Sequence, residues 1–238
     1  MNNISPLASV SPKAILGDNI EIGPFAFVDD DVEIGDGCKI FPHATVFRYV
    51  KMGKNCQIYP GAVVGAVPQD LKFEGEVTSV ELGDNVTVRE CATINRGTKA
   101  SGKYVTKVGN DTLIMSYSHI AHDCVIGDHC ILVSYVGLAG ETVVDDWAII
   151  GGGAKAHQFS KIGCHAATIS STLSRLLVKE LSGNLWQLPT TSPFISYTHA
   201  VPNVTITTVA SANACCIASI EARTAASASS LVGREKEP

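Results

Sequence analysis

The strongest constraint on this chain is a six-residue repeat. An aliphatic residue occupies every sixth position from Ile4 to Val64 without a slip. The pattern resumes at Leu82, is interrupted once more, and then runs from Val108 to Ile162. The residue two positions earlier in each repeat is mostly small or β-branched. Two columns of side chains therefore point to the same side of the chain, which makes internal repetition the first fact to explain.

A period of six predicts short strands joined by tight turns. It fits neither an α-helix, with its period of 3.6, nor a long strand that alternates with period two. Three repeats that close one coil give a parallel β-helix, in which each strand pairs with the strands one coil above and below. Residues eighteen apart then stack. Cys38 and Cys56 have this spacing in the small column, so we expect them to pack in the core and to have no redox or metal role.

Composition excludes several classes of function. The 238 residues carry a formal net charge of −5, which leaves no electrostatic footprint for nucleic acid. No run of eighteen apolar residues occurs, and the first residues lack a basic region followed by an apolar one. We therefore expect a cytoplasmic protein with no nucleic-acid partner and no membrane span. The eight cysteines are expected to stay reduced.

Two interruptions break the repeat, at residues 65–79 and 95–105, and are predicted to be loops ejected from the coil. The segments "PQDLKFEGE" and "INRGT" in these loops, with "HIAHDCVIGD", "GLAG" and "IIGGGAKAHQF" farther on, resemble one family. It is the UDP-N-acetylglucosamine O-acyltransferases that begin lipid A synthesis, within the left-handed β-helix acyltransferases. The resemblance covers about residues 1–165. It implies a mainly β, left-handed parallel β-helix over residues 1–168 that assembles as a homotrimer.

The stretch "HIAHDCVIGDHC", residues 119–130, concentrates the candidate chemistry. On the six-residue register His122 lies at a coil corner, and steps of eighteen place Gly140 and Gln158 on the same corner. Acyl transfer to a sugar hydroxyl needs a base, because an unperturbed alcohol is a poor nucleophile at neutral pH. It also needs a donor for the developing oxyanion. Histidine suits the first role, and a glycine amide suits the second.

The resemblance implies specific roles for these residues. His122 would be the general base on the glucosamine 3-hydroxyl, Asp123 would orient its imidazole, and the Gly140 amide would be the oxyanion donor. Glu141 stands where many relatives carry histidine, which alters the charge expected near the thioester. No cofactor is implied, because the acyl donor is carried on the phosphopantetheine of acyl carrier protein. The residues that would contact the sugar nucleotide or acyl chain are Gln69, Asp70, Lys72, His119, Glu141, His157 and Gln158.

Three other interpretations of the same residues remain open: another acyltransferase of this fold, a metalloenzyme and a non-enzymatic β-helix scaffold. His119, His122 and Cys124 could suit zinc, and the trimeric γ-class carbonic anhydrases share the fold. Their paired histidines are five residues apart, whereas these are three apart. Cys124 and Cys130 also fall in the inward column, away from a shared ligand site. His129 is expected on a turn as solvated surface.

The resemblance fades after Cys164. Residues 169–238 lack the "VPP" turn and the "RRGF"-like segment of the family. We predict that this segment is helical, with one helix that starts near residue 169 and ends near Gly183 and another over 208–230, although its Ser, Thr and Ala content gives a weak signal. Either a divergent cap or a reading-frame shift in the source sequence explains the change, and we favour the shift. Intact mass with peptide mapping separates the two.

Overall fold

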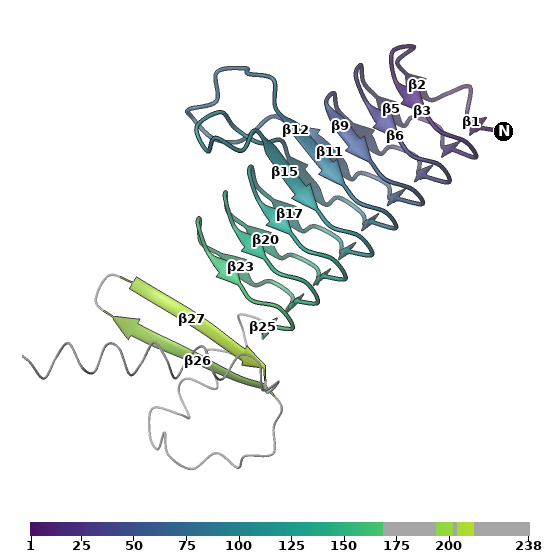
Figure 1. The fold of residues 1–238 in the computed structure, drawn as a ribbon. Helices are drawn as coiled ribbons and strands as arrows, with labels where there is room; N and C mark the ends of the chain where they lie inside the picture. The colour runs from purple at the N-terminus through teal and green to yellow at the C-terminus, as the bar shows by residue number, and fades with distance from the viewer. Residues whose placement is uncertain (169–193, 202–203, 212–238) are drawn as a thin grey trace, which may run out of the picture. The chain divides into compact units, whose positions relative to one another are not determined.

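The computed structural model describes residues 1–168, 194–201 and 204–211. The chain divides into two compact units, Met1–Leu185 and Trp186–Pro238. Within the first unit, the described residues wind into a parallel β-helix built from strands of two to four residues (Figure 1). Over the parts that the structure describes, no helix has the length and apolarity needed to cross a membrane.

Three parallel sheets form the faces of the coil, and each takes every third strand of the chain. Sheet A contains β1 (Asn3–Ile4), β4 (Glu21–Ile22), β7 (Lys39–Ile40), β10 (Gln57–Ile58), β13 (Thr87–Val88), β16 (Leu113–Ile114), β19 (Ile131–Leu132), β22 (Ile149–Ile150) and β25 (Ala167–Thr168). Sheet B contains β2 (Ser9–Val10), β5 (Phe27–Val28), β8 (Thr45–Val46), β11 (Val63–Ala66), β14 (Thr93–Asn95), β17 (His119–Ile120), β20 (Gly137–Leu138) and β23 (Lys155–Ala156). Sheet C contains β3 (Ile15–Leu16), β6 (Glu33–Ile34), β9 (Val50–Met52), β12 (Ser79–Leu82), β15 (Val105–Val108), β18 (Val125–Ile126), β21 (Val143–Val144) and β24 (Lys161–Ile162).

The strand register confirms the predicted spacing of eighteen. Ile4 pairs with Ile22, and the same step recurs along all three sheets. The step lengthens to thirty where Gln57 pairs with Thr87, and to twenty-six where Thr93 pairs with His119. The two interruptions therefore add twelve and eight residues while the coils on either side stay paired, with one register shift between Val64 and Ala66 where the first loop begins.

The predicted loops are present with slightly different bounds. Strand β11 extends to Ala66 and β12 begins at Ser79, so the first loop is residues 67–78. Strand β14 ends at Asn95 and β15 begins at Val105, so the second loop is residues 96–104. Figure 1 shows both loops projecting on the same side of the coil, near β12 and β15.

Both inward columns are buried, as predicted. Ile58 and Ile120 are fully buried in the aliphatic column, and Cys38 and Cys56 are fully buried in the small one. The Cys56 amide donates to the Cys38 sulfur over 3.3 Å, as stacked neighbours should. Ile4 is an exception, with 39% exposure, because the first coil has a neighbour on one side only.

The coil turns use bulky residues as well as the expected glycine, aspartate and asparagine. Tyr135 and Trp147 adopt left-handed backbone conformations, with φ of 65° and 62°. Such conformations are costly for large side chains. Stacking between coils offsets that cost: the rings of Tyr117 and Tyr135 lie 5.2 Å apart and nearly parallel.

The helical prediction for the C-terminal segment is wrong where the structure describes it. Strands β26 (Phe194–Val201) and β27 (Val204–Ser211) pair antiparallel, from Phe194 opposite Ser211 to Val201 opposite Val204. Strand β27 is rich in Thr, Val and Ile, and β26 contains Ile195, Val201 and the aromatic residues Phe194 and Tyr197, all of which favour strands over helices. The predicted helix that ends near Gly183, and the rest of the one over 208–230, lie outside the described residues.

Candidate active site

The turns from sheet B to sheet C form one corner of the coil, here named the B–C corner. Both the first loop and the second loop leave the coil at this corner, because each joins a strand of sheet B to one of sheet C. His122, Gly140 and Gln158 occupy the same corner in three consecutive coils. Backbone bonds link those coils: the Glu141 amide donates to the His122 carbonyl, and the Phe159 amide donates to the Gly140 carbonyl. The predicted stacking is therefore confirmed.

His122 and Asp123 form a hydrogen-bonded pair. Nδ1 of His122 lies 2.8 Å from Oδ2 of Asp123. An ionised carboxylate can only accept, so Nδ1 carries the proton and Nε2 is left as an acceptor. The His122 ring packs directly against Gly140, where an added Cβ would lie within 2.5 Å of Nε2. Any larger residue at position 140 would displace the ring.

Asp123 is fully buried in a left-handed turn, with φ of 60°. Buried carboxylates require hydrogen-bond donors. The second loop supplies two of them: the Thr98 amide donates to Oδ1 over 2.9 Å, and the Thr98 hydroxyl donates to Oδ2 over 2.6 Å. The Asp123 amide in turn donates to the Thr106 hydroxyl. Both ends of the residue are thereby held.

The residues of the first loop that were predicted to bind substrate lie at different distances from the His122 ring. Oδ2 of Asp70 lies 3.9 Å from Nε2 of His122, too far for a direct hydrogen bond. Oδ1 of Asp70 accepts from the Lys72 amide, which shapes the loop tip. The side chains of Lys72 and Gln69 are exposed. Of the three, Asp70 is the one whose side chain lies beside the His122 ring.

Charge next to Gly140 is balanced across the loop. Oε2 of Glu141 lies 3.9 Å from Nζ of Lys103, which is on the second loop. The same ammonium donates to the Asp123 carbonyl over 3.4 Å. The negative charge introduced by Glu141 is therefore partly offset by a nearby lysine.

His119 and His157 differ in burial. His119 is partly buried on β17, and Nδ1 lies 2.7 Å from the Thr93 hydroxyl. Burial lowers the pKa of His119, and the charges of Lys155 and His122 lower it further. His157 is exposed, with Nδ1 3.0 Å from the Gln158 carbonyl, and Gln158 is partly buried.

The remaining residues of "HIAHDCVIGDHC" are placed away from the pair. Cys124 and Cys130 point into the core and are fully buried, as predicted. His129 is on a turn, as predicted, but it is not simply solvated: its ring stacks on Trp147 with centroids 4.1 Å apart. Within residues 1–168 and the C-terminal hairpin, no group of three His, Cys, Asp or Glu side chains is arranged to hold a metal ion.

The two loops brace each other beside the corner. Oε1 of Glu76 accepts from the Lys99 amide over 3.0 Å. The guanidinium of Arg96 lies between the rings of Tyr49 and Phe73, 5.5 and 5.7 Å from their centroids. These contacts give the second loop a fixed position over Asp123.

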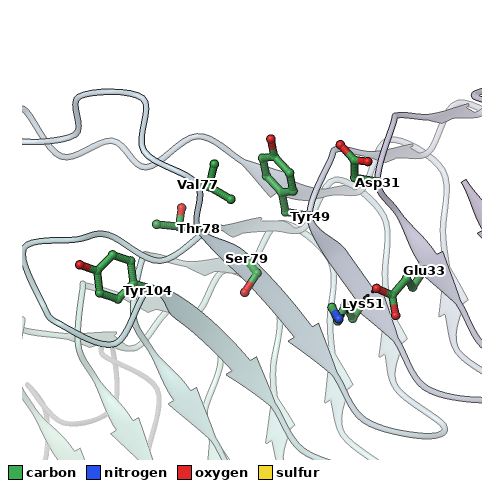
Figure 2. A pocket seen from close by; sticks show the side chains of 8 residues that line it. All are labelled: Asp31, Glu33, Tyr49, Lys51, Val77, Thr78, Ser79 and Tyr104. Atoms are coloured by element: carbon green, nitrogen blue, oxygen red, sulfur yellow. Dashed lines mark ion pairs between the residues drawn. The ribbon is translucent and has the colours of Figure 1, made fainter. Parts of the chain in front are cut away.

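A surface pocket of about 320 Å³ opens where the loops rejoin the coil (Figure 2). Figure 2 shows Tyr49, Val77 and Tyr104 around it, with the Glu33–Lys51 ion pair on one side. None of its lining residues belongs to the His122 stack, so it is a separate recess.

Comparison with known proteins identifies the family of the chain. The family described as Bacterial transferase hexapeptide (six repeats) matches residues 106–140. Two similar proteins are named acyl-[acyl-carrier-protein]–UDP-N-acetylglucosamine O-acyltransferase. That of Xylella fastidiosa is 51% identical over 170 residues, 71% of this chain and 64% of its own. That of Thiobacillus denitrificans is 52% identical over 174 residues, 73% of this chain and 67% of its own. The chain belongs to the UDP-N-acetylglucosamine O-acyltransferase family.

A solved structure gives the same result at the level of fold. The UDP-N-acetylglucosamine acyltransferase of Bacteroides fragilis is 47% identical, with a TM-score of 0.67 over 69% of this chain and 64% of that one. The fold is the left-handed parallel β-helix expected from the sequence. The chain nevertheless matches only 64% of the length of the Xylella relative.

Three residues that contact the predicted site residues could not be identified as site residues from the sequence. Thr98 holds Asp123, Thr93 contacts His119, and Lys103 links Asp123 to Glu141. Thr98 lies in the "INRGT" segment that carries the family resemblance, so its neighbourhood was noted. Its partner could not be found, because a non-repeating loop has no register that relates it to the coil.

Proposed function

We propose that the protein transfers a 3-hydroxyacyl chain from acyl carrier protein to the 3-hydroxyl of UDP-N-acetylglucosamine, the first step of lipid A biosynthesis. Family membership supports the substrates, since the relatives are named for this activity. The observation that carries the chemistry is the His122–Asp123 pair packed against Gly140. It combines a base and a backbone donor at one point on the coil.

The reaction follows from these groups. Nε2 of His122 accepts the proton of the 3-hydroxyl as its oxygen attacks the thioester carbonyl. Asp123 accepts from Nδ1 and stabilises the imidazolium that forms. The Gly140 amide donates to the tetrahedral oxyanion. When the intermediate collapses, the C–S bond breaks, and the imidazolium returns the proton to the phosphopantetheine thiolate.

The surrounding residues are assigned to substrate. Asp70 lies 3.9 Å from Nε2 of His122, which places its carboxylate beside the proposed acceptor hydroxyl, where it can accept from another donor of the sugar. The remaining assignments rest on the family resemblance alone. Gln69 is assigned to the uridine, and the sugar nucleotide and acyl chain are assigned to Lys72, His119, Glu141, His157 and Gln158. No resident cofactor is needed, because the thioester is already activated on its carrier.

The active assembly is proposed to be a homotrimer. The B–C corner lies on the outside of a single coil, whereas ligand sites are concave and bury most of their ligand. A neighbouring copy would supply the second wall of the cleft. Sedimentation equilibrium should give three times 25.1 kDa, and a concentration-independent monomer would contradict the assembly. We also infer a cytoplasmic location, in keeping with the six free thiols among the described residues.

The decisive experiment is a transfer assay with UDP-N-acetylglucosamine and acyl carrier protein thioesters of several lengths. The wild-type chain should form an O-acyl product, and His122→Ala should remove nearly all transfer while the oligomer persists. A wild-type protein that transfers no acyl chain would overturn the proposal and leave a scaffold role. Retained transfer in His122→Ala would overturn the assignment of the base alone.

A further inference from the structure

The geometry points to Thr98 as a positioning residue that sets the protonation and orientation of His122 through Asp123. This inference rests on the proposed function, because it names the residue that prepares its base. Thr98 is 2% exposed and lies in the second loop, 25 residues from its partner. It contacts neither the proposed acceptor site nor Nε2, so any effect on transfer must pass through Asp123.

Oδ2 of Asp123 is shared by two donors. The Thr98 hydroxyl lies 2.6 Å from it, and Nδ1 of His122 lies 2.8 Å from it. The direction of the hydroxyl bond is fixed by a third group, since the Ser101 amide donates to the Thr98 oxygen over 3.4 Å. The hydroxyl proton is therefore committed to Asp123. With the carboxylate accepting from both sides, the imidazole proton stays on Nδ1, and Nε2 stays open toward substrate.

The other oxygen of Asp123 is fixed by the backbone of the same residue. The Thr98 amide donates to Oδ1 over 2.9 Å. A carboxylate gripped at both oxygens by one residue cannot rotate away from the imidazole. Charge-assisted hydrogen bonds of this kind are stronger than neutral ones, especially in a buried setting.

The second loop is built to hold Thr98 at this position. The Gly97 amide donates to the Ser79 carbonyl, and Gly97 approaches the backbone of Val105 so closely that a Cβ would overlap its amide nitrogen. On the other side, Glu76 accepts from the Lys99 amide. Contacts from the first loop and from β12 therefore hold the second loop on both sides of Thr98, which in turn holds Asp123 against His122.

The test is a set of substitutions in the full chain, assayed for transfer across pH. Thr98→Val keeps the shape and removes the hydroxyl. We expect kcat to fall roughly 10- to 100-fold, the factor that one charge-assisted hydrogen bond supplies, with little change in KM. Asp123, no longer held by the hydroxyl at Oδ2, would then stabilise the imidazolium less, so the acidic limb of the kcat/KM profile should move to lower pH. Thr98→Ser should restore both.

Thr112→Val is the matched control. Thr112 is equally buried, and its hydroxyl donates to a backbone carbonyl of the coil at a different corner. It should lower stability as much as Thr98→Val but leave the acidic limb in place. Thr98→Val with unchanged kcat, or a lowered kcat with an unmoved limb and no rescue by serine, would overturn the inference.

Two further measurements keep the result decisive. If Thr98→Val does not fold, Glu76→Ala removes the carboxylate that accepts from the Lys99 amide. It should shift the acidic limb of the kcat/KM profile in the same direction, whereas Glu74→Ala should not.

If the wild type transfers no acyl chain, the proposed function fails, but the role of Thr98 can still be tested. Imidazole nitrogen NMR should then find His122 protonated at Nδ1 in the wild type and mixed in the Thr98 variant. An identical spectrum in both would contradict the role.

Discussion

The imidazole of His122 rests on the bare α-carbon of Gly140, one coil farther along. A methyl group at position 140 would come within 2.5 Å of Nε2, the nitrogen proposed to accept the substrate proton. The contact follows from the eighteen-residue step of the coil, since the two residues occupy equivalent corner positions. Ring position and backbone donor are thus set by one packing relationship.

Gly140→Ala should therefore reduce transfer without unfolding the protein. Displacing the ring by about 1 Å misaligns it with the acceptor hydroxyl, and such a shift costs about 100-fold in kcat. Steady-state kinetics would measure the loss, and circular dichroism would check the coil. Gly152→Ala is the control, because its added methyl group would meet only ordinary contacts at 3.4 Å. Equal activity of the two variants would show that the contact is unimportant.

The core offers a test of the coil itself. Ile120 follows His119 on β17, precedes the turn that carries His122, and is fully buried. Ile120→Ala should destabilise the protein by about 2–5 kcal/mol through lost burial and a cavity. Ile15→Ala removes an isoleucine that is 65% exposed and should change stability by no more than about 0.5 kcal/mol. Urea denaturation would compare them, and matching midpoints would contradict the assigned inward column.

Most of the coil was predictable because a strict period directly encodes the direction of each side chain. That is why Cys124 and Cys130 could be assigned to the core and His122 to a corner. The period does not extend into loops, so the contact between Thr98 and Asp123 could not be predicted. Nor does it report stacking on turns, where His129 lies against Trp147. The C-terminal hairpin was missed because the weak Ser, Thr and Ala signal was interpreted as helix, whereas β-branched residues dominate β27 and the aromatic residues Phe194 and Tyr197 favour strand in β26.

Cysteine reactivity should separate the core thiols from the surface ones. Burial raises the pKa of the Cys124 thiol to about 12 and also raises that of Cys130. The thiolate is the reactive form, so neither should react with iodoacetamide in the native protein. Cys91 and Cys164 are exposed and should be alkylated. Peptide mass spectrometry before and after denaturation would score each site, and native labelling of Cys124 would contradict its inward position.

The pH dependence of stability should carry the signature of His119. Burial and two neighbouring positive groups lower its pKa in the folded chain below the usual 6.5. Between the folded and unfolded pKa values the unfolded chain binds more protons, so stability rises with pH in this window and is fully present above about 6.5. It falls as the pH drops below 6.5 and levels off below the folded pKa. Melting temperatures from pH 5 to pH 8 should show this fall in the wild type and a smaller one in His119→Gln. His43→Gln, at an exposed position on a different corner of the coil, is the control for replacing a histidine elsewhere. If His119→Gln retained the full wild-type slope, a neutral, partly buried imidazole at position 119 would be ruled out.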